Sequence, residues 1–407
     1  MTAQKKENIR SHFPYFKAKK NEGKIYFDSA ATTQKPQSVI DAVVDFYESY
    51  NSNIHRSLHT DGALATRKYE QTRLLVQKFI YAKKTEEIVF TSGATESINL
   101  VANSYVKSIL KRDDIILTSP IEHHSNMLPW EMLAKSKGAK VVNIPLDTNF
   151  KIDPVQLECL IDSRVKFIAI QHTSNITGSE QDVKRIVTIA HRHHIPVLVD
   201  GAQTVAHKAI NVSDLGCDFY CFSGHKIFGP TGTGVLYGKS KLLKKMTPSK
   251  FGGGMVKSVM GQSSVWNSLP HRLEAGTPNI AGIIGLGEAI RFIQSIGFEF
   301  IKKEEASLAN YLLAALRGVG LVKIYSPEDK PCPILAFNVA GFHHYDIATL
   351  LAENGILIRS GELCSQPLMK HLNIDGCLRA SLSFYNTHKE VDLFILALKR
   401  VVKVLKG

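Results

Sequence analysis

Short apolar runs alternate with segments of helical length through most of the chain. Seven runs are rich in Val, Ile, Phe and Tyr and end in small or polar residues: 86–93, 114–120, 139–146, 165–175, 195–203, 217–224 and 232–238. Helix-length segments separate most of them, such as 96–110, 125–137 and 179–193. Nearly continuous apolar strands that alternate with helices predict an α/β fold with a mainly parallel seven-stranded sheet, covered on both faces.

The pattern changes after residue 290. Residues 304–319 predict a helix, 333–341 a strand, 346–361 a helix leading into a strand, 378–386 another strand, and 388–406 a basic amphipathic helix. We therefore expect a large domain over residues 23–289 and a smaller α+β C-terminal domain over 290–407. Residues 1–22 predict an N-terminal arm that packs on the small domain.

Composition and charge narrow the class of protein. Of the 407 residues, 44% are hydrophobic and 21% charged, as in globular proteins. The formal net charge is +13, but the lysines are scattered in pairs without interleaved aromatic residues. This distribution favours a solvated basic surface over a nucleic-acid site, because phosphate attraction requires clustered charge. A basic face for an acidic partner protein stays open.

The cysteines and the N-terminus bear on location. The six cysteines show neither a CxxC pair nor the spacing of a small disulfide-bonded domain. The first twenty residues lack the apolar segment of a signal peptide, and no run is long enough to span a bilayer. We therefore expect a cytoplasmic protein that does not enter a membrane.

Lys226 is the first candidate for chemistry. It stands where an apolar run ends and a Gly/Pro turn begins, in the sequence SGHKIFGPTG. Parallel strands present ligand-binding residues at their carboxyl ends, where partial burial lowers the pKa of a lysine and makes it a nucleophile able to form a Schiff base. Pyridoxal phosphate enzymes need such a lysine. They also need a carboxylate beside the pyridinium nitrogen, and Asp200 at the preceding strand end fits, although a helix-capping Asp would look the same.

Other polar residues at strand ends complete a candidate cofactor site. Gln203 can reach the ring hydroxyl, and His123 can lie against one face of the ring. The phosphate would be held at a helix start by Thr95, by the N–H groups around Gly93 and Ala94, and by Ser223 and His225.

The C-terminal part supplies a second group. Arg379 and Arg359 are candidate clamps for an α-carboxylate. Cys364 lies in a polar loop between Gly361 and Pro367, a setting typical of an accessible thiol. The histidine-rich run 191–194 lies near the end of a predicted exposed helix without a Cys or carboxylate cluster, so we expect no metal site.

Together these motifs resemble the class V aminotransferase-like enzymes of fold-type I, and more closely the SUF-type (group II) cysteine desulfurases. The resemblance is carried by DSAATTQKP (28–36), NIHRSLHT (53–60), TSGATESIN (91–99), EHHSN (122–126), HTSNITG (172–178), VDGAQ (199–203), SGHKIFGPTGTGVLYG (223–238), EAGTPN (274–279), RSGELCSQPLM (359–369) and RASLSFYNT (379–387). It implies a pyridoxal phosphate-dependent transferase and a homodimer with its sites at the subunit interface.

The resemblance also implies a role for each site residue. Lys226 would hold the cofactor, Asp200 would pair with the ring nitrogen, and His123 would stack on the ring. Asn175 and Gln203 would bind near the ring hydroxyl, while Thr95, Ser223, His225 and the other subunit's Thr277 would bind the phosphate. The substrate carboxylate would be held by Arg379, Asn175 and Arg359, and Cys364 would accept the sulfur.

The implied reaction converts L-cysteine into alanine and a Cys364 persulfide. A SufE-like or SufU-like partner would receive the sulfur for iron–sulfur cluster assembly. One departure is the pair Glu362-Leu363 before the cysteine, where many members carry His or another polar residue. Selenocysteine lyase, acting on L-selenocysteine, could share every residue named. Kynureninase-like or transaminase activity would leave Cys364 without a role, and the intact Lys226, Asp200 and Cys364 argue against a non-catalytic basic binding protein.

Overall fold

A seven-stranded sheet forms the centre of the computed structural model, which describes residues 9–261, 263–329 and 331–407. Its strands are β2 (Ile88–Thr91), β3 (Ile115–Thr118), β4 (Lys140–Asn143), β5 (Val165–Gln171), β6 (Val197–Asp200), β7 (Phe219–Ser223) and β8 (Gly234–Gly238), in the order β2-β8-β7-β6-β5-β3-β4. Neighbours are parallel except that β8 runs antiparallel to both β2 and β7. All seven predicted strands belong to this sheet, and the predicted fold class is confirmed.

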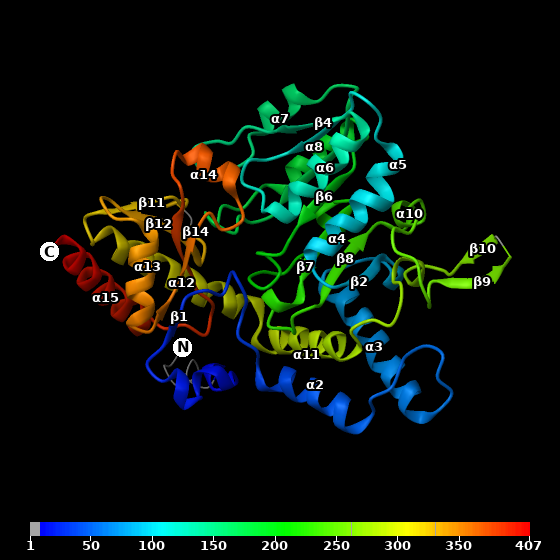
Figure 1. The fold of residues 1–407 in the computed structure, drawn as a ribbon, viewed down its shortest axis with the longest axis horizontal. Coiled ribbons are helices and arrows are strands. Elements are labelled where there is room, and N and C mark those ends of the chain that lie inside the picture. Colours follow the sequence, from blue (N-terminus) through cyan, green and yellow to red (C-terminus); the bar gives the residue numbers. More distant parts are fainter. Residues whose placement is uncertain (1–8, 262, 330) are drawn as a thin grey trace.

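Helices cover both faces of the sheet (Figure 1). Side chains alternate between the faces along each strand. In β5, Ile168 and Ile170 belong to one core, and Phe167 and Ala169 to the other. The first core is covered by α3 (Thr60–Phe79), α8 (Val183–Arg192) and α11 (Ile280–Ile296), and the second by α4 (Ala94–Val101) and α6 (Leu128–Lys137).

A smaller antiparallel sheet, of order β11-β12-β15-β14, forms the C-terminal part. Its strands are β11 (Val322–Ile324), β12 (Ile334–Val339), β14 (Arg359–Gly361) and β15 (Cys377–Ser381), and its core is shared with α12 (Phe298–Arg317), α13 (His344–Glu353) and α15 (His388–Lys406). β1 (Ile25–Tyr26) pairs with β13 (Ile356–Leu357), so the start of the chain joins this part. The predicted boundary at 289–290 falls inside α11, and the domain limits stay predictions.

The remaining elements connect these layers. They are α2 (Gln37–Ser49), α5 (Lys107–Ile109), α7 (Pro154–Leu160), α9 (Val212–Leu215), α10 (Ser240–Leu243), α14 (Gln366–Leu372), the hairpin β9 (Val256–Met260) and β10 (Ser263–Trp266), the π-helical turn η4 (Ala102–Val106), and the 3₁₀ turns η1 (Pro14–Phe16), η2 (Lys19–Asn21), η3 (Thr85–Glu87), η5 (His124–Asn126), η6 (Gly224–Lys226) and η7 (His271–Leu273). Among the described helices, none is long and apolar enough to cross a membrane alone. Only α11 and α12 taken together would be, and they are bent by 78°.

Phe13 anchors the described part of the predicted arm, whose residues 1–8 lie outside the described residues. Its ring is fully buried and lies 4.9 Å from Tyr385, 5.5 Å from Phe292 and 6.0 Å from Phe228, measured between ring centroids. The arm therefore contacts the large domain as well as Tyr385 of the small one.

Replacing Phe13 by Ala should lower the free energy of unfolding by about 3–5 kcal/mol, because the substitution leaves a cavity where several aromatic rings meet. Urea denaturation at fixed protein and cofactor concentration measures the change. Tyr47→Ala is the control, since that side chain is 60% exposed. A cost for Phe13→Ala no larger than that of the control would contradict this role of the arm.

Candidate functional site

A cavity of about 330 Å³ opens at the carboxyl ends of the central strands. Asp200 ends β6, Ser223 ends β7, and Lys226 follows in η6. Except for Thr277, all predicted site residues line this cavity: Thr95, His123, Asn175, Asp200, Gln203, Ser223, His225, Lys226, Arg359, Cys364 and Arg379. Thr277 accepts a hydrogen bond from Asn53 instead (3.3 Å), and its role toward another subunit stays a prediction.

Burial shifts the pKa values of Lys226 and Asp200 in opposite directions. It lowers the pKa of Lys226 below the usual lysine range, although the charge of Asp200 opposes this shift. It also raises the pKa of Asp200, while a hydrogen bond from the Ala202 N–H to Oδ1 (2.9 Å) acts in the opposite direction. A lysine that gives up its proton more easily is the nucleophile that the sequence predicted here.

His123 lines the same cavity, and its imidazole ring is neutral near pH 7. Burial lowers its pKa to about 4, assisted by the charges of Lys226, His124 and Arg379. Its Nδ1 accepts the Ser125 N–H at 3.1 Å, which fixes the orientation of the ring. A neutral imidazole without a strong charge is suited to lie flat against another aromatic ring.

The start of α4 is the predicted phosphate-binding end of the cavity. Ser223 Oγ accepts the Ala94 N–H at 2.9 Å, and Thr95 Oγ1 lies 2.8 Å from Ser125 Oγ. Free N–H groups at a helix start attract phosphate. Burial lowers the pKa of His225 to about 4, helped by the charges of Lys226 and Lys35, so His225 is neutral at this end.

Asp28 holds both predicted carboxylate-binding arginines. Its Oδ1 accepts from Arg379 Nη2 at 3.0 Å, and its Oδ2 accepts from Arg359 Nη2 at 2.8 Å. Arg379 also donates through Nη1 to the Asn175 carbonyl oxygen (2.9 Å), whereas its buried Nε has no hydrogen-bond partner. A substrate carboxylate must therefore share these guanidinium groups with Asp28, which sequence reasoning did not single out.

The Cys364 loop takes an unusual backbone conformation. Leu363 and Cys364 have φ angles of 52° and 59°, in the left-handed region that non-glycine residues rarely adopt. Two hydrogen bonds hold this turn: Asn175 Nδ2 donates to the Leu363 carbonyl (3.0 Å), and the His124 N–H donates to the Cys364 carbonyl (2.8 Å). The thiol is exposed to the cavity that Lys226 also lines.

Glu122 contacts the same loop through Ser365. Its backbone carbonyl accepts from Ser365 Oγ at 3.0 Å, and its carboxyl accepts from Ser119 Oγ (2.5 Å) and Asn126 Nδ2 (2.7 Å). Burial raises the pKa of this carboxyl to about 8. A protonated carboxyl avoids a buried negative charge beneath Cys364.

Comparison with known proteins settles the family. The class V aminotransferase model matches residues 25–394. The chain belongs to this family. It is 47% identical to a probable cysteine desulfurase of Halalkalibacterium halodurans over 92% of each chain. Among solved structures, the apo cysteine desulfurase of Thermococcus onnurineus NA1 superposes with a TM-score of 0.93 at 40% identity, over 98% of each chain. The S-sulfonic acid form of the cysteine desulfurase CsdA from Escherichia coli gives 0.90 at 40% identity and the same coverage.

The cavity of this class V aminotransferase fits pyridoxal phosphate, the family's cofactor. Lys226 would supply the amine, Asp200 the carboxylate for the ring nitrogen, and the start of α4 the end that holds the phosphate. Asn175 Oδ1 is buried without a hydrogen-bond partner, so the cavity offers an unused acceptor as well as the unused Arg379 Nε. Unpaired buried polar atoms are costly, and a polar ligand removes that cost.

Sequence reasoning missed Lys35, which contacts the residue that precedes Lys226. Its ammonium donates to the His225 carbonyl (2.9 Å) and to the Thr33 carbonyl (2.5 Å). Thr32 and Thr33 hydroxyls donate to the same His225 carbonyl, each at 3.1 Å. Burial lowers the pKa of Lys35 to about 7. This segment, 32–35, therefore fixes the peptide that precedes Lys226.

The histidine-rich run 191–194 differs from expectation in one respect. Asp218 places a carboxylate oxygen 2.7 Å from His191 Nε2, so this run does have a carboxylate beside it. The same Asp218 accepts from Lys239 at 2.8 Å, which makes the contact an ion-pair network.

Lys35→Met should weaken the retention of pyridoxal phosphate about tenfold, because a charged hydrogen bond to the His225 carbonyl is lost. The dissociation constant is measured from the visible absorbance of the bound cofactor during dilution. Lys20→Met, at an exposed lysine, is the control. Unchanged retention in Lys35→Met would contradict the positioning role.

The same variant should alter the pH dependence of stability. The unfolded chain binds the Lys35 proton up to a pH near the ordinary lysine pKa, whereas the folded chain releases it at about 7. Above pH 7 the unfolded chain binds more protons at Lys35 than the folded chain does, so this residue makes the free energy of unfolding rise with pH. Lys35→Met removes this contribution. Urea denaturation of both proteins at several pH values tests this. Parallel pH profiles would show that the Lys35 pKa is not lowered.

Proposed function

We propose that this chain is a cysteine desulfurase that uses pyridoxal phosphate to convert L-cysteine into L-alanine and a persulfide on Cys364. The observation that carries the proposal is that Cys364 and Lys226 line one cavity. A transaminase needs the lysine but has no use for the thiol. The full-length relatives named above, which carry the name cysteine desulfurase, agree with this activity.

Each group has a defined task in the proposed reaction. Bound pyridoxal phosphate withdraws electrons from an amino acid and so weakens its Cα–H bond. Arg379 and Arg359 hold the substrate carboxylate together with Asn175, and this orients Cα toward Lys226. Lys226 removes the Cα proton as a general base, a task that its lowered pKa favours.

Sulfur transfer then proceeds without an external oxidant. The Cys364 thiolate attacks the sulfur of the substrate, so an S–S bond forms while the Cβ–S bond breaks. The electron pair of the broken bond stays with the carbon fragment, which takes up protons and leaves as alanine. Cys364 is left as a persulfide. The left-handed turn at Leu363 and Cys364 is the part of the loop that presents this sulfur.

The partners belong to the same proposal. The sequence RSGELCSQPLM at 359–369 favours the SUF-type group, whose persulfide passes to a SufE-like or SufU-like acceptor for iron–sulfur cluster assembly. The reaction needs Cys364 as a free thiol, so it suits a reducing, cytoplasmic compartment.

Glu362 lies two residues before Cys364. Its carboxylate accepts a hydrogen bond from Gln366 Nε2 at 2.6 Å.

A homodimer is supported by the exposed hairpin β9–β10, which projects from the body (Figure 1). Val259 and Met260 are 63% and 69% exposed, and neighbouring Phe251 is 70% exposed. Exposed apolar residues gathered on one element are typical of an interface. A second copy would cover them and bring its Thr277 to the cofactor phosphate.

Cys364→Ser should abolish alanine formation from L-cysteine, because a hydroxyl cannot accept the sulfur. Alanine is quantified in the presence of a reducing agent. Cys159→Ser, at the other exposed cysteine, should keep wild-type turnover. If Cys364→Ser retained full cysteine turnover, the proposed mechanism would be wrong, and loss of cysteine turnover with retained turnover of L-selenocysteine would favour a selenocysteine lyase.

The dimer proposal predicts a solution mass near twice the 45.1 kDa of one chain. Light scattering after size exclusion measures it. A double variant, Val259→Asp with Met260→Asp, should shift the protein toward the monomer by placing charges in the interface, whereas Val155→Asp, at a residue 62% exposed elsewhere, should not. A monomeric wild type would overturn the proposal.

A further inference from the structure

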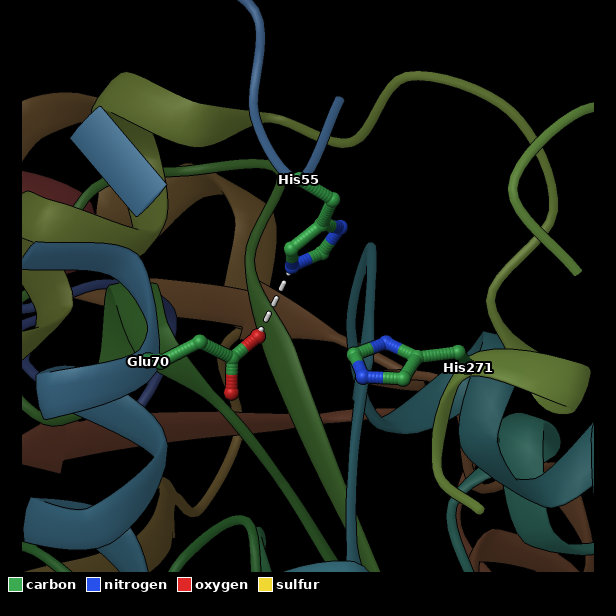
Figure 2. A group of neighbouring side chains, drawn as sticks. All are labelled: His55, Glu70 and His271. Carbon is green, nitrogen blue, oxygen red and sulfur yellow. Dashed lines mark hydrogen bonds and ion pairs between the residues drawn. The ribbon is translucent and has the colours of Figure 1, made fainter. Parts of the chain in front are cut away.

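Two histidines and a glutamate meet outside the cofactor cavity. Figure 2 shows His55, Glu70 and His271, which come from the loop before α3, from α3 and from η7. His55 Nε2 lies 3.0 Å from Glu70 Oε1, and one ligand atom from each residue lies within 4.8 Å of the others. Sequence reasoning found no such group, because His271 lies some two hundred residues from the other two.

Arg73 holds the carboxylate in position. Its Nε donates to Glu70 Oε2 at 2.8 Å and its Nη2 donates to Oε1 at 3.2 Å, the oxygen that also lies 3.0 Å from His55 Nε2. Glu274 accepts from Arg73 Nη1 at 2.6 Å and balances its charge. The Arg73 guanidinium is only 2% exposed. Ligating carboxylates in metal sites are commonly oriented by such a second hydrogen-bonding partner.

Neighbouring groups shift the pKa values of Glu70 and His271. Burial would raise the pKa of Glu70, but hydrogen bonds from His55 and Arg73 and the charge of Arg73 lower it to about 2. Burial lowers the pKa of His271, and the charge of Arg73 acts in the same direction.

We propose that His55, Glu70 and His271 bind one divalent transition-metal ion, with Zn²⁺ preferred and water in the fourth position. Two imidazoles and a carboxylate form a ligand set that Zn²⁺ uses in proteins. Bonds of about 2 Å bring tetrahedral ligand atoms to about 3.3 Å from one another. Ligand atoms as far as 4.8 Å apart must then approach one another by up to about 1.5 Å.

The proposed ion would link the loop before α3, α3 itself and η7. The His55 loop and the segment after η7 already touch through Asn53 and Thr277. None of the three ligands lines the cavity of Lys226. The ion would therefore stabilise the contact between these loops, and this inference does not depend on the proposed desulfurase activity.

A second histidine pair makes a poorer site. His343 and His344 are adjacent in sequence and their rings stack at 4.3 Å. Their carboxylate, Asp375, is 77% exposed, and its oxygens lie 3.6 and 3.9 Å from the two rings. His344 Nδ1 is already bonded to Ser360 Oγ (2.8 Å). This pair provides a matched control.

Co²⁺ and Zn²⁺ binding to the holoenzyme tests the proposal. Exposed thiols also bind these ions, so the protein carries Cys159→Ser and Cys364→Ser. After chelator treatment and dialysis, Co²⁺ should produce visible d–d bands of a tetrahedral site, saturating at about one ion per chain and displaced by Zn²⁺. Calorimetry with Zn²⁺ gives the affinity independently.

His55→Asn and His271→Asn should each weaken binding at least tenfold, while His343→Asn should leave it unchanged. The cofactor absorbance band and the far-ultraviolet circular dichroism show that each variant is folded. Absence of stoichiometric binding in the parent would overturn the proposal. So would binding that persists in the two cluster variants, or binding that falls equally in all three variants.

Discussion

The carboxylate of Asp28 joins three distant segments of the chain. It accepts hydrogen bonds from Arg359 and Arg379, which lie on neighbouring strands of the small sheet, and Arg379 in turn bonds to the Asn175 carbonyl beside the large sheet. Asn175 then holds the Leu363 carbonyl. This series of bonds fixes Cys364 over a cavity whose other wall carries Lys226. Together with the bonds from the His124 N–H to Cys364 and from Ser365 Oγ to Glu122, it sets the position of the thiol relative to the lysine.

Burial is the common cause of the charge state in the cavity. It lowers the pKa of Lys226, His123 and His225 and raises that of Asp200. Each shift favours the neutral form, as expected where charged groups lose their hydration. A cofactor that brings a phosphate and a ring nitrogen would supply charges to this cavity. The two arginines carry two positive charges, of which the single carboxylate of Asp28 balances one.

The sequence predicted those site residues that directly follow a strand of the large sheet. Asp200, Ser223 and Lys226 follow apolar strands, and parallel strands present such residues at one edge. The contribution of Asp28 could not be predicted this way, because its partners lie more than three hundred residues away. Lys35 and Glu122 were also missed. Lys35 donates to the backbone carbonyl of His225, and the backbone carbonyl of Glu122 accepts from Ser365, and such contacts leave no spacing pattern in the sequence. The antiparallel strand β8 was not foreseen either, because its apolar residues look the same in either direction.

The central claim is that sulfur moves from the substrate to Cys364. Mass spectrometry of the peptide that contains Cys364, taken after a single turnover with L-cysteine and without reductant, tests it most directly. The account predicts one added sulfur atom on this peptide, matched by one alanine released. Alanine release with an unmodified Cys364 peptide and the added sulfur on another cysteine would contradict it.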